Sequence, residues 1–451
     1  MKAFKAYDIR GIFGVDFTAV DAYKIGFFIP ELLNTTKVLV GRDIRNSSDE
    51  IHQELIKGIC DAGADVYDAG LTTTPMIYWA TAKFDFEASV QITASHNPRE
   101  YNGMKISGKN ALPVGYDSGL SDLERWIEQK KIIPKEIGGQ LISLDFKTEY
   151  IHFQKQYLSD LSQLSMVVDC SNGMAGLLIK DILGDQPKYL YDTPDGDFPN
   201  HDPNPLELEN VKDLQQMVLA QKADIGVIFD GDADRVMFVD ELGKFIPPDL
   251  IIALLGNYFL KQDSHNNKVL QDIRSSKSVA EYLEPMGAQM HTWKVGRAFA
   301  AEKLREIDGL FGGEYAGHYY FKDFYYSDSG IMAALVVLDI VSEKKKQGLS
   351  LSQMIAEISN YANSGEINFV IEEKQQAMDA VKAYFEKQEA PTHFYDFDGY
   401  RIEFNDWWLN IRPSNTEPYL RFLAEARTQE MLDKKIAEVR KVLKTYLMSG
   451  D

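Results

Sequence analysis

The chain has 451 residues, of which 45% are hydrophobic, and its formal net charge is −20. The length predicts several domains, each with a well-buried core. The negative charge argues against nucleic acid or an anionic membrane as the main partner, because both require a basic surface. The charge does not exclude a small phosphorylated ligand, since such a ligand needs only a few arginines and lysines in one cleft.

No apolar run reaches the ~18–20 residues of a membrane span, and the first residues lack the long apolar stretch of a secretory signal. We therefore expect neither. Cys60 and Cys170 lie in apolar segments without CxxC spacing, which is typical of reduced thiols. These features together predict a cytoplasmic protein.

The first predicted unit is a strand, a helix and a strand, followed by two strands around a polar loop. Its elements lie at residues 37–45, 47–63, 64–70 and 88–107. Ser48 is the expected N-cap of the helix and Gly63 its C-terminal stop. The last two strands enclose the loop TASHNP.

Two later stretches repeat this pattern. The second unit comprises residues 165–173, a helix-like AGLLIKDIL, 187–192 and 223–241; the third comprises 268–276, a helix-like VAEYLEPMG, 288–296 and 309–321. Three such units predict three sister α/β domains with mixed, mostly parallel sheets. The loops TASHNP, DGDADR and GEYAGH then occupy equivalent places. Since ligands collect at the C-terminal ends of strands, we expect all three loops around one central cleft.

The pattern changes near residue 363. A strand start, an amphipathic helix, three strand-like segments and a closing helix predict a smaller C-terminal α+β domain. The strand-like segments lie around 394–404, 407–412 and 419–427. The expected domains are 1–147, 148–246, 247–362 and 363–451.

The loop DGDADR carries Asp230, Asp232 and Asp234, each separated by a small residue. In an extended loop this spacing points all three carboxylates the same way, and they repel one another unless a cation lies between them. Oxygen ligands favour Mg²⁺ or Ca²⁺. An EF-hand is excluded because Arg235 stands at the glycine position and strands flank the loop. Arg235 indicates an anionic ligand beside the metal.

The loop TASHNP carries Ser95, which is a weak nucleophile without a base. A phosphorylated Ser95 would supply an oxygen to a three-aspartate metal site. His96 is adjacent, and neighbours in an extended loop point apart, so a serine–histidine pair is not favoured. Lys105, on the next strand, is better placed for a phosphate or sugar oxygen. A plain polar turn is the alternative for this loop.

The loop GEYAGH offers Glu314 and His318, which can bind vicinal sugar hydroxyls; the alternative is an ordinary hairpin with polar tips. Lys294 and Arg297, in HTWKVGR, are cleft cations or solvated surface charges. Arg10, in AYDIRG, is ambiguous alone.

The segment NIRPSNTEP lies between two strand-like stretches. It combines a guanidinium, hydroxyls, an amide and turn N–H groups, which suits an anion; the alternative is a polar hairpin turn. Its candidate residues are Arg412, Ser414, Asn415 and Thr416.

The motifs TASHNP, DGDADR, GEYAGH and RPSNTEP, in this order and at these separations, resemble those of the α-D-phosphohexomutase superfamily. The resemblance covers essentially the whole chain. The stretches FKAYDIRG, DFPNHDPNP and KDFYYSDSG look most like those of its bacterial phosphomannomutase and phosphoglucomutase members. Three departures leave sugar preference open: Tyr315 and Ala316 in the sugar loop, Arg297 after KVG, and Ala233 in the metal loop.

The resemblance implies residue roles at the matching positions. The implied metal ligands, for Mg²⁺, are Ser95, Asp230, Asp232 and Asp234. The implied catalytic residues are Ser95, His96, Lys105 and Arg10, without a choice of general acid or base among the last three. The implied substrate-binding residues are Arg235, Lys294, Arg297, Glu314, His318, Arg412, Ser414, Asn415 and Thr416.

The implied reaction interconverts hexose 1-phosphate and hexose 6-phosphate, with mannose favoured and glucose possible. Phospho-Ser95 donates to a free O1 or O6, and a hexose 1,6-bisphosphate is the intermediate and activator. The partners are then small hexose phosphates, without nucleic acid or membrane, for a monomer or small homo-oligomer. The alternatives are a Mg²⁺-dependent sugar phosphatase with a serine nucleophile and a non-catalytic sugar-phosphate sensor.

Overall fold

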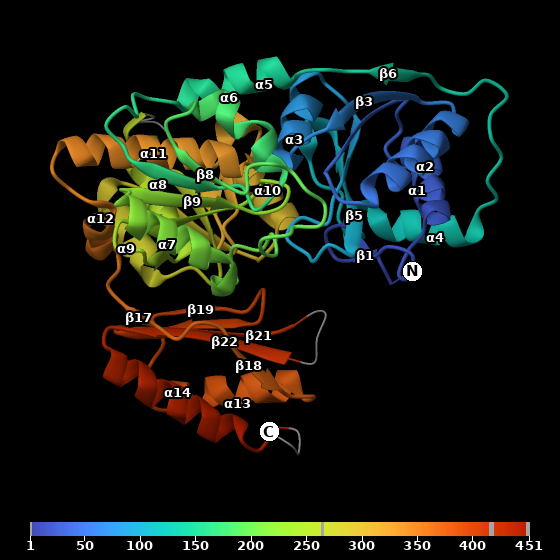
Figure 1. Cartoon of the computed structure of the whole chain (residues 1–451). Coiled ribbons are helices and arrows are strands. Elements are labelled where there is room, and N and C mark those ends of the chain that lie inside the picture. Colours follow the sequence, from blue (N-terminus) through green and yellow to red (C-terminus); the bar gives the residue numbers. More distant parts are fainter. Residues whose placement is uncertain (1, 263–265, 415–418, 448–451) are drawn as a thin grey trace.

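The structure is a computed structural model that describes residues 2–262, 266–414 and 419–447 (Figure 1). Asn415 and Thr416 of the expected phosphate loop lie outside these residues. Four sheets organise the described chain, each built from one stretch of sequence. The fourth, in red, lies beneath the yellow and green domains in Figure 1.

The first domain has a six-stranded sheet in the order β1-β5-β4-β2-β3-β6. Its strands are β1 (Ile9–Ile12), β2 (Lys37–Arg42), β3 (Asp65–Leu71), β4 (Ala88–Ile92), β5 (Tyr101–Gly108) and β6 (Leu141–Ser143). Its helices are α1 (Ala19–Leu32), α2 (Ser48–Asp61), α3 (Thr74–Lys83) and α4 (Ser121–Gln129), and α5 (Lys147–Gln154) leads into the second domain.

The second and third domains each have a five-stranded sheet. The second contains β7 (Met166–Asp169), β8 (Lys188–Leu190), β9 (Ile225–Phe229), β10 (Val236–Asp240), β11 (Phe245–Ile246), α6 (Ile179–Leu183) and α7 (Lys212–Gln221). The third contains β12 (Lys268–Asp272), β13 (Gln289–Trp293), β14 (Phe311–Gly313), β15 (Tyr319–Phe321), β16 (Ser327–Asp328), α8 (Pro248–Gln262), α9 (Lys277–Leu283), α10 (Arg297–Ile307), α11 (Gly330–Lys346) and α12 (Leu351–Ile358).

One strand order recurs in the three sheets. The order β5-β4-β2-β3 returns as β10-β9-β7-β8 and as β15-β14-β12-β13. In each set the first strand is antiparallel to the second, and the remaining pairs are parallel. The prediction of three sister α/β domains is confirmed, and the three motif loops join equivalent strands.

The first strand of each repeat, β2, β7 or β12, lies inside its sheet and leads into the same kind of turn. An aspartate accepts a hydrogen bond from the backbone N–H two residues further on. The three pairs are Asp43 with Arg45 (3.0 Å), Asp169 with Ser171 (2.8 Å) and Asp272 with Arg274 (2.6 Å). Such a turn ends the strand without leaving the N–H unpaired.

The fourth domain is an antiparallel sheet in the order β17-β22-β21-β20-β19, with β18 also on β22. It contains β17 (Ala362–Asn363), β18 (Ile367–Val370), β19 (His393–Tyr395), β20 (Tyr400–Glu403), β21 (Trp407–Pro413), β22 (Tyr419–Ala426), α13 (Lys374–Glu386) and α14 (Gln429–Leu443). The expected single strand at 394–404 was wrong: it is two strands around Gly399, whose φ of +66° suits a tight turn.

Two local expectations were also wrong. Ser48 is the first residue of α2 rather than its N-cap, and its hydroxyl donates to Asp43 at 2.6 Å instead. The helix-like AGLLIKDIL is α-helical only over Ile179–Leu183, after a short 3₁₀ turn at Met174–Leu177. Gly63 does follow the end of α2, with a φ of +81°.

One hydrophobic core joins the first three domains, running from Trp79 on α3 through Phe229 to Phe311. The fourth domain has a separate core around Trp407. It is joined to the third by contacts that include the Arg401 Nη1 donation to Ser275 O at 2.6 Å and a ring contact between Trp293 and Phe397, whose ring centres are 5.3 Å apart. Among the described helices, none is long and apolar enough to cross a membrane.

Candidate active site

The three motif loops meet at a cavity of about 630 Å³. Its lining includes the predicted residues Arg10, Ser95, Lys105, Asp234, Arg235, Arg297, Glu314 and His318. They come from all three sister domains. The three loops, which follow equivalent strands, therefore converge on one cleft, as the repeat predicts.

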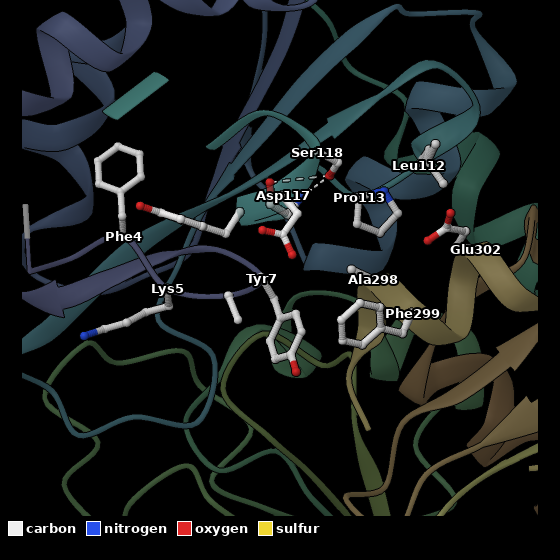
Figure 2. Close-up of a pocket in the computed structure, with 13 residues that line it drawn as sticks. Phe4, Lys5, Tyr7, Leu112, Pro113, Asp117, Ser118, Ala298, Phe299 and Glu302 are labelled. Carbon is white, nitrogen blue, oxygen red and sulfur yellow. Dashed lines mark hydrogen bonds between the residues drawn. The ribbon is translucent and has the colours of Figure 1, made fainter. Parts of the chain in front are cut away.

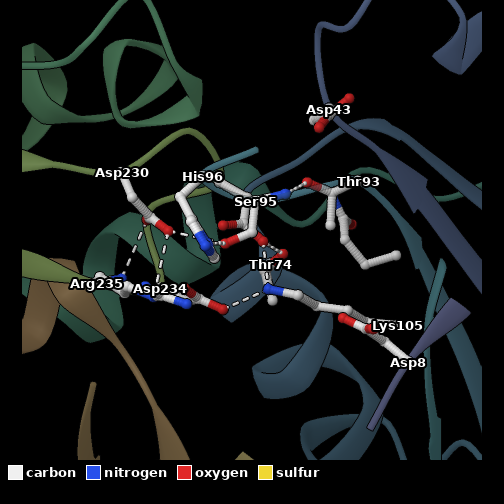
Figure 3. Close-up of polar contacts among 12 residues, drawn as sticks. Asp8, Asp43, Thr74, Thr93, Ser95, His96, Lys105, Asp230, Asp234 and Arg235 are labelled. Carbon is white, nitrogen blue, oxygen red and sulfur yellow. Dashed lines mark hydrogen bonds and ion pairs between the residues drawn. The ribbon is translucent and has the colours of Figure 1, made fainter. Parts of the chain in front are cut away.

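Ser95 follows β4 and is almost fully buried, with 1% of its surface exposed. Its hydroxyl donates to Asp230 Oδ2 at 2.9 Å, across the interface between the first two domains (Figure 3). Its φ is +52°, in the left-handed region, which costs a residue with a side chain about 1–2 kcal/mol. The fold therefore holds Ser95 against the acidic loop in an unfavourable backbone conformation. Such strained residues are common at functional sites.

The backbone at Ser95 changes the expectation for His96. An extended loop would separate the two side chains, but here His96 Nδ1 lies 3.4 Å from Ser95 Oγ. Burial, followed by the guanidinium groups of Arg235 and Arg10, lowers the pKa of His96 well below its usual range. The imidazole is neutral at pH 7 and can accept a proton.

The carboxylates of Asp230, Asp232 and Asp234 present oxygens that all lie within 4.8 Å of one another. All three side chains are fully buried. The loop is a turn rather than extended: Ala233 has a φ of +62°, and its N–H donates to Asp230 O at 3.2 Å. The carboxylates thus converge through the turn, not through the period-two spacing that we expected.

Repulsion within this cluster is uneven. Burial, then the charges of Asp234 and Asp232, raises the pKa of Asp230 well above its usual range. Burial opposes ionisation of Asp234 too, but Lys105, His318 and Arg235 together lower its pKa. The cluster therefore needs positive charge to ionise fully, and Lys105 and Arg235 supply part of that charge to Asp234.

Lys105 supplies much of that charge. Its Nζ donates to Asp232 Oδ2 at 2.6 Å and to Asp234 Oδ2 at 2.5 Å (Figure 3). Thr74, at the start of α3, also donates its hydroxyl to Asp232. Lys105 lines the cleft as expected, but its present partners are carboxylates rather than a phosphate or sugar. Sequence reasoning missed Thr74, since nothing near it in the chain signals a site.

The cluster suits a divalent cation. The second oxygens, Asp232 Oδ1 and Asp234 Oδ1, are buried and accept no hydrogen bond from any residue that the structure describes. Buried carboxylate oxygens without donors are costly unless a cation lies nearby. Hard oxygen donors of this kind match Mg²⁺.

Glu314 and His318 lie on opposite sides of the short turn between β14 and β15. Tyr320 donates its hydroxyl to Glu314 Oε1 at 2.7 Å. His318 Nε2 accepts from Arg235 Nε at 2.9 Å, so its Nδ1 carries the proton and donates to Asp328 Oδ2 at 2.6 Å. Both ring nitrogens of His318 therefore already have protein partners, which the sequence did not indicate.

Arg274 is a cleft residue that sequence reasoning missed. Asp272 Oδ2 holds its Nη2 at 2.6 Å, and Glu314 Oε2 lies 3.9 Å away. Burial, followed by the nearby charge of Arg274, lowers the pKa of Arg412 in the fourth domain. A guanidinium whose charge is disfavoured by a second guanidinium marks a place where an anion is attracted. A signal was present: the Asp-x-Arg of residues 272–274 repeats that of 43–45.

Three other predicted residues, Lys294, Arg412 and Ser414, lie outside this lining. Lys294 places its Nζ 5.2 Å from the centre of an aromatic ring of α10. Arg412 Nη2 is 3.8 Å from Glu366 Oε2, and Ser414 N donates to a backbone carbonyl of β22 at 2.8 Å. All described lining residues precede residue 319, so the cleft is built by the first three domains.

A second cavity, of about 940 Å³, adjoins the cleft and shares Lys5 and Tyr7 with it. Figure 2 shows the rings of Tyr7 and Phe299 side by side, and their centres are 5.5 Å apart in an edge-on arrangement. Tyr7 also donates its hydroxyl to Val295 O at 3.1 Å. Tyr7 is thus fixed between the two cavities, by the loop that leads into α10.

Comparison with known proteins identifies the group to which this arrangement belongs. Four domain families described as phosphoglucomutase/phosphomannomutase match in order: domain I at residues 1–131, domain II at 148–243, domain III at 247–361 and the C-terminal domain at 366–442. A phosphomannomutase from Methanocaldococcus jannaschii is 35% identical over 449 residues, which cover 98% of each chain.

Further relatives extend this match. A phosphomannomutase from Escherichia coli is 35% identical over 460 residues, covering 98% of this chain and 99% of the relative. A solved phosphoglucomutase/phosphomannomutase family protein from Burkholderia thailandensis has a TM-score of 0.87 and 28% identity, covering 98% of this chain and 97% of that one. With all four domains matched in order, the chain belongs to the phosphoglucomutase/phosphomannomutase family.

Proposed function

We propose that this protein is a phosphohexomutase that interconverts hexose 1-phosphates and hexose 6-phosphates through a phosphorylated Ser95. The observation that carries the proposal is the 2.9 Å contact between the Ser95 hydroxyl and a cluster of three buried aspartates in a cation-lined cleft. The family and the activity named for its phosphomannomutase relatives support it. A mannose phosphate is the favoured substrate and a glucose phosphate the second.

The domain roles follow from the loops. We assign the phosphoserine loop to residues 1–147, the metal loop to 148–246, the sugar loop to 247–362 and the phosphate loop to 363–451. We expect the fourth domain to close over the cleft, since its own core lets it move as one body and Arg412 belongs to it.

The metal ligands would be Asp230, Asp232 and Asp234, with an oxygen of the phosphorylated Ser95 completing the set. Bound Mg²⁺ supplies positive charge that neutralises the phosphoryl group and the three carboxylates. Arg235 and Arg10 flank the serine and orient the phosphoryl oxygens. Lys105 donates to two of the aspartates, Asp232 and Asp234.

The reaction moves one phosphoryl group at a time. The bond between phosphorus and Ser95 Oγ breaks as the free O1 or O6 of the sugar phosphate bonds to phosphorus. The sugar hydroxyl loses its proton to a base, and Ser95 Oγ takes up a proton from an acid. The hexose 1,6-bisphosphate turns round in the cleft and returns its other phosphate to Ser95. It also serves as the activator that loads a dephosphorylated serine.

The resemblance leaves three residues open for the proton transfers, and their surroundings distinguish them. His96 is neutral and adjoins Ser95, which suits a base. Burial disfavours the charge of Lys105, but Asp232 and Asp234 raise its pKa, so its ammonium gives up a proton less readily than that of a free lysine. Arg10 donates to Asn97 Oδ1 at 2.9 Å and cannot give up a proton near pH 7.

Substrate recognition uses the remaining cleft residues. We expect Glu314 to bind sugar hydroxyls and His318 to join it only if its bond with Arg235 opens. Arg297 binds phosphate, and Lys294 reaches the ligand only after a change of rotamer. The non-reacting phosphate would be held by Arg412, Ser414, Asn415 and Thr416.

Product analysis tests this function against a phosphatase or a sensor. The chain is incubated with mannose 1-phosphate or glucose 1-phosphate, Mg²⁺ and a trace of glucose 1,6-bisphosphate. We expect the 6-phosphate isomer as the main product, and the ratio of the two kcat/KM values gives the sugar preference. Inorganic phosphate as the main product would identify a phosphatase, and unchanged substrate a sensor.

Replacing Glu314 with glutamine is expected to lower kcat/KM by about 10–100-fold, because hydrogen bonds from sugar hydroxyls to a carboxylate are worth ~1.5–3 kcal/mol in a buried site. Tyr320 can still donate to the amide oxygen, so the fold should be unchanged. Initial rates with mannose 1-phosphate measure the effect. Glu302→Gln, in the neighbouring cavity, is the control and should match the wild type. Equal rates for both variants would remove Glu314 from the sugar site.

We also propose a cytoplasmic protein, since Cys60 and Cys170 are both free thiols. Its partners are small hexose phosphates, and nucleic acid and membranes are not expected among them. A monomer or a small homo-oligomer is expected, which light scattering measures.

A further inference from the structure

We propose that Arg45 is a positioning residue for phosphoryl transfer: it fixes the backbone of the serine loop so that Ser95 Oγ faces the metal cluster. The inference rests on the proposed function of Ser95. Arg45 lies just past β2, at a position that no motif of the chain marks as functional, and 2% of its surface is exposed.

The guanidinium of Arg45 is bonded almost entirely to the serine loop. Nη2 donates to Ser95 O at 2.8 Å and to Asn97 O at 2.6 Å. Nη1 donates to Pro98 O at 2.7 Å and to Tyr101 O at 3.0 Å. One planar group therefore binds four backbone carbonyls between the end of β4 and the start of β5, and this defines the path of the loop.

The guanidinium is itself fixed from both sides. Within its own domain, Asp43 Oδ2 lies 3.3 Å from Arg45 Nε, and Asp43 Oδ1 accepts from Arg45 N. From the second domain, the ring of Phe198 lies 5.0 Å from the guanidinium carbon, within the range of a cation–π contact. The neighbouring Asn46 donates to Asp197 at 2.9 Å. The arginine therefore connects the serine loop to the domain that carries the metal loop.

The bond to Ser95 O matters because of the backbone there. Ser95 adopts a φ of +52°, and its carbonyl lies between Arg45 and Gly231, where even a Cβ on the glycine would come within 2.5 Å of the Ser95 oxygen. If the Ser95 peptide rotates, the carbonyl leaves Arg45 and the hydroxyl leaves Asp230. The four bonds thus hold an otherwise unfavourable conformation in which the nucleophile faces the cluster.

The equivalent turns of the sister domains support this reading. In the third domain Arg274 takes the same place after Asp272 and points into the cleft, towards Glu314. In the second domain the place belongs to Ser171, whose hydroxyl donates to Phe229 O at 2.6 Å, the last residue of the strand before the metal loop. In each domain, the residue at this position therefore contacts the strand or loop of the motif or points into the cleft. In the first domain it contacts the serine loop.

The test measures how fast Ser95 takes up a phosphoryl group. Dephosphorylated full-length chain is mixed with glucose 1,6-bisphosphate and Mg²⁺, and intact mass follows the phosphorylated fraction over time at several concentrations. We expect Arg45→Lys, which keeps the charge but loses the planar fork, to lower the maximal rate constant by about 30–100-fold. The half-saturating concentration should stay within about threefold, because Arg45 does not line the cleft.

Arg305→Lys is the matched control. Arg305 also donates to backbone carbonyls, those of Ala301, Asn110 and Tyr325, but none belongs to the serine loop. We expect its rate constant to equal that of the wild type. A purely structural role for Arg45 would lower the fraction of chains that react and leave the rate constant of the reacting chains unchanged, which would overturn the inference.

The remaining outcomes are also decisive. If the wild type takes up no phosphate, the proposed function fails, whatever the variant does. If Arg45→Lys does not fold, Phe198→Leu takes its place, since it removes the ring that fixes the plane of the guanidinium and thereby loosens the four carbonyl bonds. We expect its rate constant to fall by about 3–10-fold, and an unchanged rate constant would overturn the inference.

Discussion

Replacing Ser95 with alanine is expected to lower kcat by about 10⁴-fold or more, the scale on which removal of a nucleophile acts. It should also abolish a phosphorylated form about 80 Da heavier than the unmodified chain. The hydroxyl is the group that meets the Asp230 carboxylate at 2.9 Å, and alanine leaves no atom to carry the phosphoryl group. Mutase assays with mannose 1-phosphate and intact-mass spectra give the two readouts.

A second buried serine, on the strand that follows the serine loop, serves as the control. Ser107, on β5, is also buried, and its hydroxyl has no hydrogen-bond partner among the described residues. Ser107→Ala should therefore keep the activity and the heavier form. Wild-type activity in Ser95→Ala would assign the nucleophile elsewhere. Activity lost with the heavier form retained would point to a different phosphorylated residue.

The repeat was the most informative feature of the sequence. Apolar strands, caps and polar loops recur at similar intervals, and right-handed βαβ units leave few alternatives for connecting them. The positions of Ser95, Asp230 and Glu314 at one cleft followed from this repeat before any contact was known. Local patterns were weaker guides: Ser48 became a helix residue because its hydroxyl found Asp43.

Contacts between distant residues were not predictable in the same way. Thr74 reaches Asp232 from a helix start 158 residues away, and nothing in its neighbourhood marks it. The positive φ of Ser95 cannot be predicted from its residue type, and that angle places His96 Nδ1 beside Ser95 Oγ. Arg235 and His318 paired through an antiparallel bridge between two loops, which no single loop could indicate.

Neutralising one aspartate of the cluster is expected to have opposite effects on stability and on activity. In Asp230→Asn we expect kcat/KM to fall by about 10³-fold, since a charged metal ligand is lost. Without metal, the variant should be more stable than the wild type at pH 7–8, by about 1 kcal/mol in the free energy of unfolding. Asp230 is the member whose ionisation the fold opposes most clearly, through burial and then through Asp234 and Asp232.

The direction of the pH dependence follows from that pKa. The pKa of Asp230 is raised in the folded protein, so its contribution to stability is present at low pH and is lost as the pH rises through the raised value. Asparagine cannot ionise and avoids this loss. The stability gained by Asp230→Asn in EDTA should therefore grow as the pH increases above about 4, where an unfolded aspartate ionises.

Thermal or urea unfolding in EDTA and in Mg²⁺ measures both effects. Mg²⁺ at a free concentration of 100 times its dissociation constant stabilises the folded wild type by about 2.7 kcal/mol. Asp230→Asn should lose most of that stabilisation. Asp249→Asn is the control, because Asp249 is not a member of the cluster, and burial and then Glu425 raise its pKa to about 7. Its response to Mg²⁺ should equal that of the wild type. Equal Mg²⁺ stabilisation of the wild type and Asp230→Asn would place the cation outside this cluster. If metal-free Asp230→Asn were less stable than the wild type, the hydrogen bonds of the Asp230 carboxylate to Ser95 and Arg235 would outweigh the repulsion among the aspartates.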